Sequence, residues 1–155
     1  MYQERTLEAV ELLKRLIATP SVSRDEAAAA DVLEAYMKEK GLAPMRHGNN
    51  VWCMSNGFDE KKPTVLLNAH IDTVKPVAGW QHDPFTPALE GDRLYGLGCN
   101  DCGGGLMSLL QAFMQLNEEM LPFNLVYLAS CEEEVSGKQG IESVLPLLPE
   151  IDFAI

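Results

Sequence analysis

The chain has 155 residues and a mass of 17.1 kDa, the size of one ordinary domain that buries about 70% of its unfolded surface. Hydrophobic residues make up 46% and charged residues 23%, which is unlike disordered, collagen-like or coiled-coil chains. The formal net charge is −11, from 12 Lys and Arg against 23 Asp and Glu. We therefore expect neither a nucleic acid nor an anionic membrane as a partner.

The sequence also indicates a cellular location. No stretch reaches the roughly 18 apolar residues of a membrane span, and the N-terminal MYQERTLEAVELLKR has charges where a signal peptide needs an apolar core. We expect a cytoplasmic protein. In that compartment its four cysteines, Cys53, Cys99, Cys102 and Cys131, are expected to be reduced thiols.

Two helices are predicted near the N-terminus. Apolar residues recur at helical spacing over 6–18, and the pattern stops before Pro20. The second helix is predicted to begin at Ser23 as N-cap, with Glu26 three residues later as in a capping box, and to end at Gly41.

The rest of the chain alternates apolar strands with helices. Residues 71–91, rich in Pro, Gly and Asp, are expected to form an irregular loop with a functional role. The order predicts an α/β fold with a mixed, mainly parallel central sheet flanked by helices, and ligands beyond the carboxyl ends of the strands. Strands are predicted over 51–55, 64–69, 93–95, 123–129 and 151–155, and helices over 106–119 and 140–148.

His70 and Asp72 follow the second of these strands as an H-x-D sequence. Residues two apart in an extended segment point the same way, so His70 can bind a metal while Asp72 accepts the second ring N–H and fixes the tautomer. A purely structural histidine is the alternative for His70 taken alone.

Asp101 lies in the glycine-rich segment GLGCNDCGGG, where the backbone can bend sharply and approach a ligand. A carboxylate there is well placed to bridge two cations, and the alternative is a cap for the helix that follows. The segment lacks the third glycine of a dinucleotide fingerprint and the Lys-Ser/Thr of a phosphate-binding loop.

Glu132, Glu133 and Glu134 come directly after a buried apolar strand. Clustered like charges repel one another unless a cation, a proton or solvent compensates them, so either a metal site or a solvated acidic loop is expected. With a metal present, one glutamate would bind it while its neighbour faces the attacking water as general base.

Cys99 and Cys102 form a C-x-x-C sequence. A redox pair or a structural zinc site would need a different context or a second ligand pair, so we interpret both thiols as small residues that line the site. An oxidoreductase remains a distant alternative.

Taken together, LLNAHIDTV, Trp80 with Asp83-Pro84-Phe85, LYGLGCND and SCEEEVSG resemble the cocatalytic zinc amidohydrolases, the family of acetylornithine deacetylase, succinyl-diaminopimelate desuccinylase, aminoacylase and glutamate carboxypeptidase. The sequences of residues 73–77 and 94–98 are most similar to the acetylornithine or acetylcitrulline deacetylase branch, which implies a role in arginine biosynthesis. The sequence departs from the family at Cys102, because the usual Asp-Met-Lys-Gly is missing its lysine, and at Glu132, which replaces an Asp.

The resemblance implies roles for five residues. His70 binds one zinc, Asp72 orients it, Asp101 bridges two zincs, Glu133 is the general base and Glu134 binds the second zinc. Cobalt or manganese are expected substitutes for zinc. The register within the three glutamates is open by one residue.

The resemblance also implies that residues 1–155 are the N-terminal portion of a catalytic domain. A further carboxylate ligand, a last histidine and a lid domain that forms a homodimer are expected outside it. The implied function is hydrolysis of the amide bond of a small N-acyl amino acid by a metal-bound water. The alternatives are a dipeptidase or carboxypeptidase of the same family, or a non-catalytic fragment that binds metal or an amino acid.

Overall fold

The structure is a computed structural model that describes residues 2–155. Three short helical turns lie between the main elements, over Cys99–Gly104, Glu133–Val135 and Leu145–Leu147. The helices are α1 (Tyr2–Ile17), α2 (Ala27–Glu39), α3 (Gly105–Leu116) and α4 (Ile141–Val144), and the strands are β1 (Met45–His47), β2 (Asn50–Met54), β3 (Thr64–His70), β4 (Ala88–Glu90), β5 (Arg93–Tyr95), β6 (Asn124–Ser130) and β7 (Phe153–Ala154).

A five-stranded sheet in the order β1-β2-β6-β3-β7 forms the centre of the molecule. β6, β3 and β7 are mutually parallel, whereas β2 pairs antiparallel with both β1 and β6. β4 and β5 form a separate antiparallel hairpin. The predicted α/β class with a mixed, mainly parallel sheet is confirmed, since β2 alone runs against the other four strands of this sheet.

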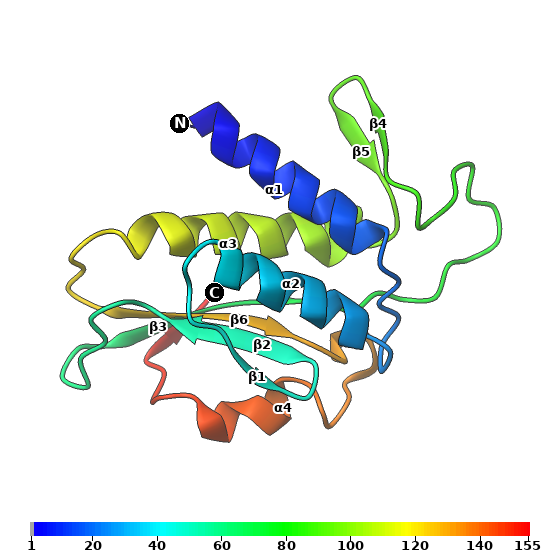
Figure 1. The fold of residues 1–155 in the computed structure, drawn as a ribbon. Coiled ribbons are helices and arrows are strands. Elements are labelled where there is room, and N and C mark those ends of the chain that lie inside the picture. The colour runs from blue at the N-terminus through cyan, green and yellow to red at the C-terminus, as the bar shows by residue number, and fades with distance from the viewer. Residues whose placement is uncertain (1) are drawn as a thin grey trace.

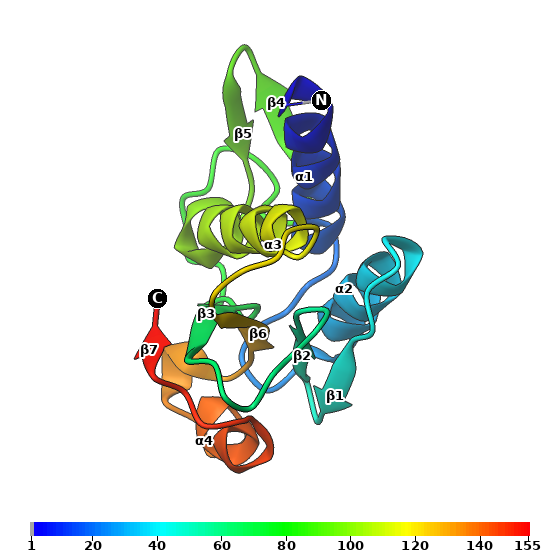
Figure 2. The same ribbon diagram turned by 90° about the vertical axis from the view of Figure 1, so that its left-hand side faces the viewer.

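Helices cover both faces of the sheet, as Figures 1 and 2 show. α2 and α3 pack on one face with α1 against both of them, and α4 lies on the other face. Alternate strand residues supply the two cores because successive side chains point to opposite faces. Leu67, Ala69, Leu125 and Tyr127 belong to the larger core under α1–α3, and Leu66, Val126 and Leu128 pack with Val144 of α4.

The two central strands are buried because their sequences are almost entirely apolar. All seven residues of β6 are buried, and β3 has five buried and two half-buried residues. A strand covered by helices on both faces needs such a continuous apolar run rather than alternation. The predictions for 64–69 and 123–129 are therefore confirmed: β3 is one residue longer at its end, and β6 is displaced by one residue.

The predicted start of the second helix is wrong. α2 begins at Ala27, Glu26 occupies the N-cap position without a side-chain cap bond, and Ser23 lies outside the helix. The Ser23 hydroxyl instead donates to Asp72, and the Glu26 carboxylate accepts the backbone N–H groups of nearby Arg24 and of distant Glu132. At the other end Gly41, with φ of +78°, follows the last turn as predicted.

Other boundaries differ in length. β1 and β4 were not predicted, because each is a three-residue strand with half-exposed residues and no alternating pattern. The helix predicted over 140–148 is a four-residue α4 followed by a turn with Pro146, which has no N–H to extend an α-helix. The strand predicted over 151–155 is shorter: Phe153 and Ala154 form β7, and Asp152 and Ile155 beside them also hydrogen-bond to the backbone of β3.

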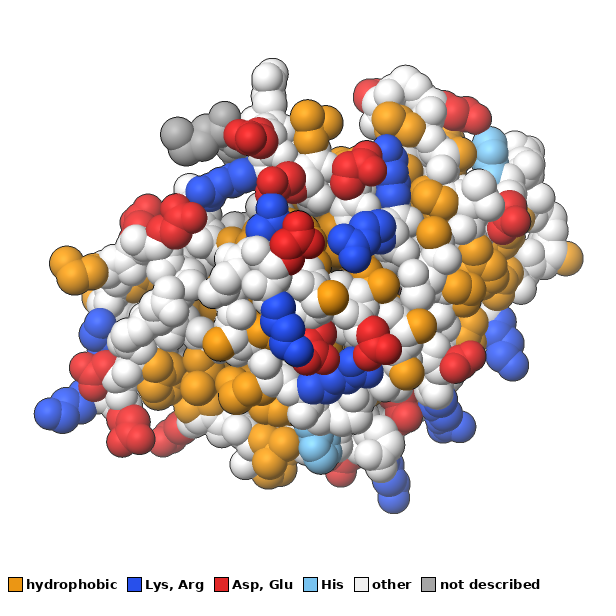
Figure 3. All heavy atoms as spheres, viewed as in Figure 1, with side chains coloured by type: hydrophobic (Ala, Val, Ile, Leu, Met, Phe, Trp, Pro, Cys, Tyr) orange, Lys and Arg blue, Asp and Glu red, His pale blue; other side chains and the backbone are white. Residues whose placement is uncertain are grey.

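Charges of both signs are mixed on the face viewed in Figure 3. Arg46 pairs with Asp31 and Glu34, and Lys40 lies 2.8 Å from Glu8. The net negative charge is therefore not spread evenly over this face. Within residues 2–155, no helix is long and apolar enough to cross a membrane.

Candidate metal centre

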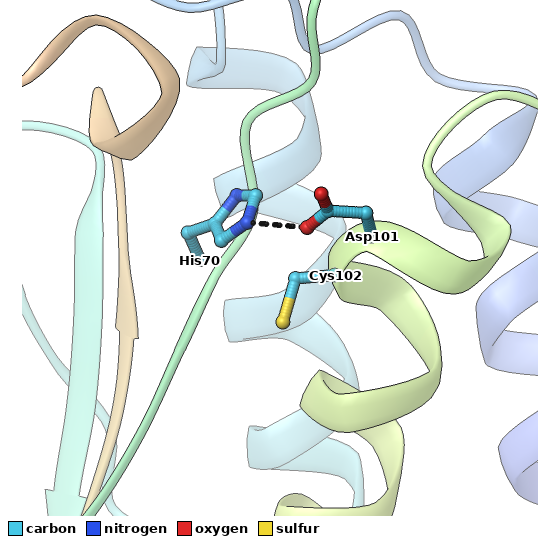
Figure 4. Close-up of side chains that lie close together, drawn as sticks. All are labelled: His70, Asp101 and Cys102. Atoms are coloured by element: carbon cyan, nitrogen blue, oxygen red, sulfur yellow. Dashed lines mark hydrogen bonds and ion pairs between the residues drawn. The ribbon is translucent and has the colours of Figure 1, made fainter.

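The parallel pairing of β3 and β6 brings two distant segments to the same edge of the sheet. The strands are in register, with His70 opposite Ser130 at their carboxyl ends. The glutamates that follow β6 therefore turn toward His70. The loop before α3, which carries Asp101, reaches the same place (Figure 4).

The ring of His70 is held from one side and faces carboxylates on the other. Nδ1 lies 2.8 Å from the main-chain oxygen of Asp72 and 3.4 Å from its carboxylate Oδ1. Both partners are acceptors, so Nδ1 is the donor and Nε2 is the nitrogen available to a metal. Nε2 lies 3.1 Å from Asp101 Oδ1 and 3.8 Å from Glu133 Oε2.

Asp72 is 1% exposed and holds three segments together. Its Oδ1 accepts the Glu133 N–H at 3.0 Å, and its Oδ2 accepts the Glu134 N–H at 3.1 Å and the Ser23 hydroxyl at 2.7 Å. Burial alone would raise the pKa of Asp72, but these bonds and His70 lower it overall. The carboxylate is thus ionised and fixes both the histidine and the acidic turn, a wider role than the sequence predicted.

Asp101 and Cys102 approach His70 from the loop before α3. Figure 4 shows the Asp101 carboxylate facing the imidazole, with the Cys102 thiol beneath them. The Asp101 side chain is 78% exposed. Asp101 lies four residues before Gly105, the first residue of α3, and the N-cap of this helix is Gly104. The alternative that Asp101 caps this helix is therefore wrong.

The three glutamates occupy different environments. Glu132 is 9% exposed, and its Oε2 accepts the backbone N–H of Gln139 at 3.3 Å. Glu133 is exposed and Glu134 is half-buried, and both side chains reach the neighbourhood of His70. The alternative of a uniformly solvated acidic loop does not describe this turn.

The donor set suits a divalent cation. Two groups of side chains each have ligand atoms that all lie within 4.8 Å of one another. One group is His70, Asp101 and Cys102, and the other is His70, Glu133 and Glu134. In residues 2–155, His70 is the sole basic side chain within 4 Å of the Asp101 and Glu133 carboxylates. One imidazole and several carboxylates are ligands that zinc and manganese accept.

The carboxylates of this cluster outnumber the positive charges near them, and the pKa values of two residues are raised. Burial, followed by the nearby Asp101, raises the pKa of Glu134. Hydrogen bonding to Asp72 first, and then to Asp101, raises the pKa of His70 to about 10 against the opposing effect of burial. A bound cation would replace that proton and stabilise the carboxylates.

The structure brings together all five residues singled out from the sequence. Cys102, expected to line the site, lies within the first ligand group. Two further residues were not expected there: Ser23 binds Asp72, and Glu26 binds the Glu132 N–H at 3.2 Å. Ser23 and Glu26 were read as helix caps, since their partners are 49 and 106 residues away.

Comparisons with known proteins agree on one family. The sequence profile of Peptidase family M20/M25/M40 matches residues 66–155. A succinyl-diaminopimelate desuccinylase of Blochmanniella floridana is 28% identical over 150 residues, which cover 91% of this chain and 39% of the relative. The chain thus spans about two fifths of that relative's length.

Solved structures have the same fold. The M20 family metallo-carboxypeptidase Sso-CP2 from Sulfolobus solfataricus matches with a TM-score of 0.78 and 25% identity over 96% of this chain and 36% of that one. The Bacillus subtilis YXEP protein, a dinuclear metal binding peptidase, matches with a TM-score of 0.75 and 18% identity over 98% of this chain and 42% of that one. The latter likeness shows the fold alone.

Proposed function

Because the chain belongs to peptidase family M20/M25/M40, we propose that it supplies the metal-binding edge of a hydrolase that cleaves the amide bond of N-acyl amino acids. The observation that carries the proposal is the position of His70. Its Nδ1 is fixed by Asp72, while its Nε2 faces Asp101 at 3.1 Å and Glu133 at 3.8 Å.

We assign the metal ligands as the sequence predicted. His70 would hold one zinc, Asp101 would be shared by two, and Glu134 would hold the second, with cobalt or manganese as substitutes. The two groups of candidate ligand atoms, both of which include His70, support a two-metal arrangement. A bound metal supplies Lewis acidity, which polarises the acyl carbonyl and acidifies the attacking water.

The protein side chains then divide the remaining work. Glu133 takes the proton of the attacking water and passes it to the leaving amine, a role worth about 10²- to 10⁴-fold in rate. Its side chain is 59% exposed, so water reaches it directly. Asp72 keeps the proton on Nδ1 of His70 and, through two backbone N–H groups, sets the positions of Glu133 and Glu134.

Substrate and cellular role are part of the proposal. Acetylornithine or acetylcitrulline, in arginine biosynthesis, are the substrates that the deacetylase branch would use. The similarity to the B. floridana desuccinylase supports an N-succinyl amino acid as the substrate instead. The cytoplasmic location and the homodimer stay predictions from the sequence.

Matched substitutions in the protein as its gene encodes it test the assignment. Glu133→Gln should retain metal and lose about 10²- to 10⁴-fold in turnover, whereas Glu134→Gln should lose metal. Glu119→Gln, an exposed glutamate of a distant segment, is the control and should change neither quantity. Unchanged turnover in Glu133→Gln would refute the proposed general base.

A peptidase activity is the second candidate, because the Sso-CP2 carboxypeptidase matches this chain in structure at 25% identity. Turnover of acetylornithine, acetylcitrulline, succinyl-diaminopimelate and simple dipeptides by the metal-loaded protein separates the two. Hydrolysis of dipeptides alone would favour the peptidase. Binding of amino acids without turnover of any of them would favour the non-catalytic alternative.

A further inference from the structure

A cavity of about 480 Å³ opens beside the candidate metal centre. Asp101 and Glu134, two of the three proposed zinc ligands, line it, whereas His70 does not. Its volume lies within the range of about 300–1,000 Å³ that small-molecule sites occupy. The cavity therefore has room for one part of a substrate whose scissile carbonyl is at the metals.

Apolar side chains make up most of the rest of the lining. They come from the loop after β3 and from the segment around β5: Val74, Trp80, Leu94, Tyr95 and Leu97. Trp80 remains 38% exposed and Val74 50% exposed, so apolar surface faces the cavity without a partner from the chain. Removing that surface from water favours an apolar ligand group.

Charge gives a second constraint. In residues 2–155, no lysine or arginine lines the cavity, and its carboxylates are Asp101 and Glu134. Away from the metals, a ligand group that carries its own carboxylate would meet no basic side chain of the described residues to pair with. An uncharged group carries no such penalty.

The position of the proposed general base indicates which side of the scissile amide bond lies in the cavity. Glu133, which passes its proton to the leaving amine, is absent from the lining, whereas Asp101 and Glu134 are present. We infer that the cavity binds the acyl side of the amide and selects an uncharged, apolar acyl chain, with Trp80 as a specificity-determining residue. This inference rests on the proposed function and adds the acyl class to it.

Turnover of three substrates that share one amino acid tests the inference. The N-acetyl, N-hexanoyl and N-succinyl derivatives are compared by kcat/KM in the metal-loaded protein as its gene encodes it. We expect the hexanoyl compound to exceed the succinyl compound by at least about tenfold, the effect of a fitted apolar group. Trp80→Ala should lower the ratio of hexanoyl to acetyl kcat/KM by a similar factor.

Two valines of the same loop provide a matched control. Val74 lines the cavity, whereas Val77 does not and is 71% exposed. Val74→Arg should shift preference toward the succinyl compound, because it places a cation in the cavity, and Val77→Arg should leave the preference as in the unmodified protein. A succinyl preference in the unmodified protein, or a ratio insensitive to Trp80→Ala, overturns the inference.

A binding measurement separates this inference from the proposed reaction. Calorimetric dissociation constants for the hexanoyl and succinyl compounds are obtained with Glu133→Gln, in which hydrolysis does not consume the ligand. Tighter hexanoyl binding that is lost with Trp80→Ala supports the cavity assignment even if the unmodified protein hydrolyses nothing, a result that would refute the proposed function alone. Neither hydrolysis nor a binding preference would overturn both.

Discussion

The carboxylate of Glu26 accepts the backbone N–H of Glu132 at 3.2 Å, across 106 residues of sequence. Glu26 is fully buried, and it also accepts the Arg24 N–H at 2.6 Å and the Asn49 side-chain amide at 2.8 Å. Three donors thus converge on one carboxylate at the start of α2. Together with Asp72, it anchors the backbone of all three glutamates in the acidic turn.

Replacing Glu26 should therefore weaken metal binding, although Glu26 is not itself a candidate metal ligand. Glu26→Ala leaves the buried Glu132 N–H without an acceptor, which costs about 1–3 kcal/mol of stability, and also removes the acceptor of the part-buried Arg24 N–H. Glu26→Gln keeps one carbonyl oxygen for the Glu132 N–H and should be milder. Urea unfolding and metal content measure both effects. Equal stability of the two variants would show that the carboxylate is not acting as an acceptor.

Substitutions of Asp72 and Ser23 should weaken zinc binding to different extents. Asp72→Asn replaces one acceptor oxygen by an amide, so the bonds to the acidic turn and to His70 cannot all persist. Zinc affinity should fall about 10- to 100-fold, as is typical when the partner of a ligating histidine is changed. Ser23→Ala removes one hydrogen bond and should cost less. Competition with a zinc-binding dye gives both constants, and the reverse order would contradict the geometry.

Zinc binding should release a proton from His70. The pKa of His70 is raised to about 10 by Asp72 and Asp101, so the metal-free imidazole is protonated at pH 7 and must become neutral to bind metal. The apparent zinc affinity should rise with pH up to about 10. Calorimetry at pH 7 in two buffers of different ionisation enthalpy counts the protons. No difference between the buffers would contradict the prediction.

The same shift fixes the sign of a stability effect in the metal-free protein. A folded-state pKa of about 10 against an ordinary value of 6.5 stabilises the fold fully below pH 6.5. This contribution is lost as the pH rises toward 10. His70→Asn should flatten the fall in melting temperature between these two pH values, which thermal unfolding in the presence of a chelator will measure.

Alanine substitutions at Gly98 and Gly57 distinguish the cost of backbone strain from the cost of a steric clash. Both have positive φ, +73° and +67°, which strains any residue with a Cβ. A Cβ at Gly98 would lie 2.5 Å from Thr73 Cγ2, whereas at Gly57 nothing lies within 4 Å. Gly57→Ala should cost about 1–2 kcal/mol and Gly98→Ala more, with metal lost as well. Equal unfolding free energies would show that Thr73 moves aside freely.

The buried strands could be predicted because local composition alone determines them. β3 and β6 are continuous apolar runs, and the H-x-D and triple-glutamate sequences directly follow such runs. Together with the glycine-rich segment, these strand ends gave the residues that the structure places side by side.

Long-range polar contacts could not be predicted in the same way. Ser23 and Glu26 have the pattern of a capping box, but Asp72 and the Glu132 N–H compete for them and win. β1 exists because β2 pairs with it, and its three residues carry little signal of their own. Which of the glutamates faces inward likewise depends on Gln139, whose N–H binds Glu132.

The parallel pairing of β3 and β6 has a consequence for the order of events during folding. Parallel strands need a crossover connection, and here it includes the β4–β5 hairpin and α3. Closing such a long loop is slow compared with forming a helix or a hairpin. A growing chain therefore exposes His70 and Asp101 before the glutamates exist to join them, and it acquires a complete set of these donors in one late step, when β6 enters the sheet.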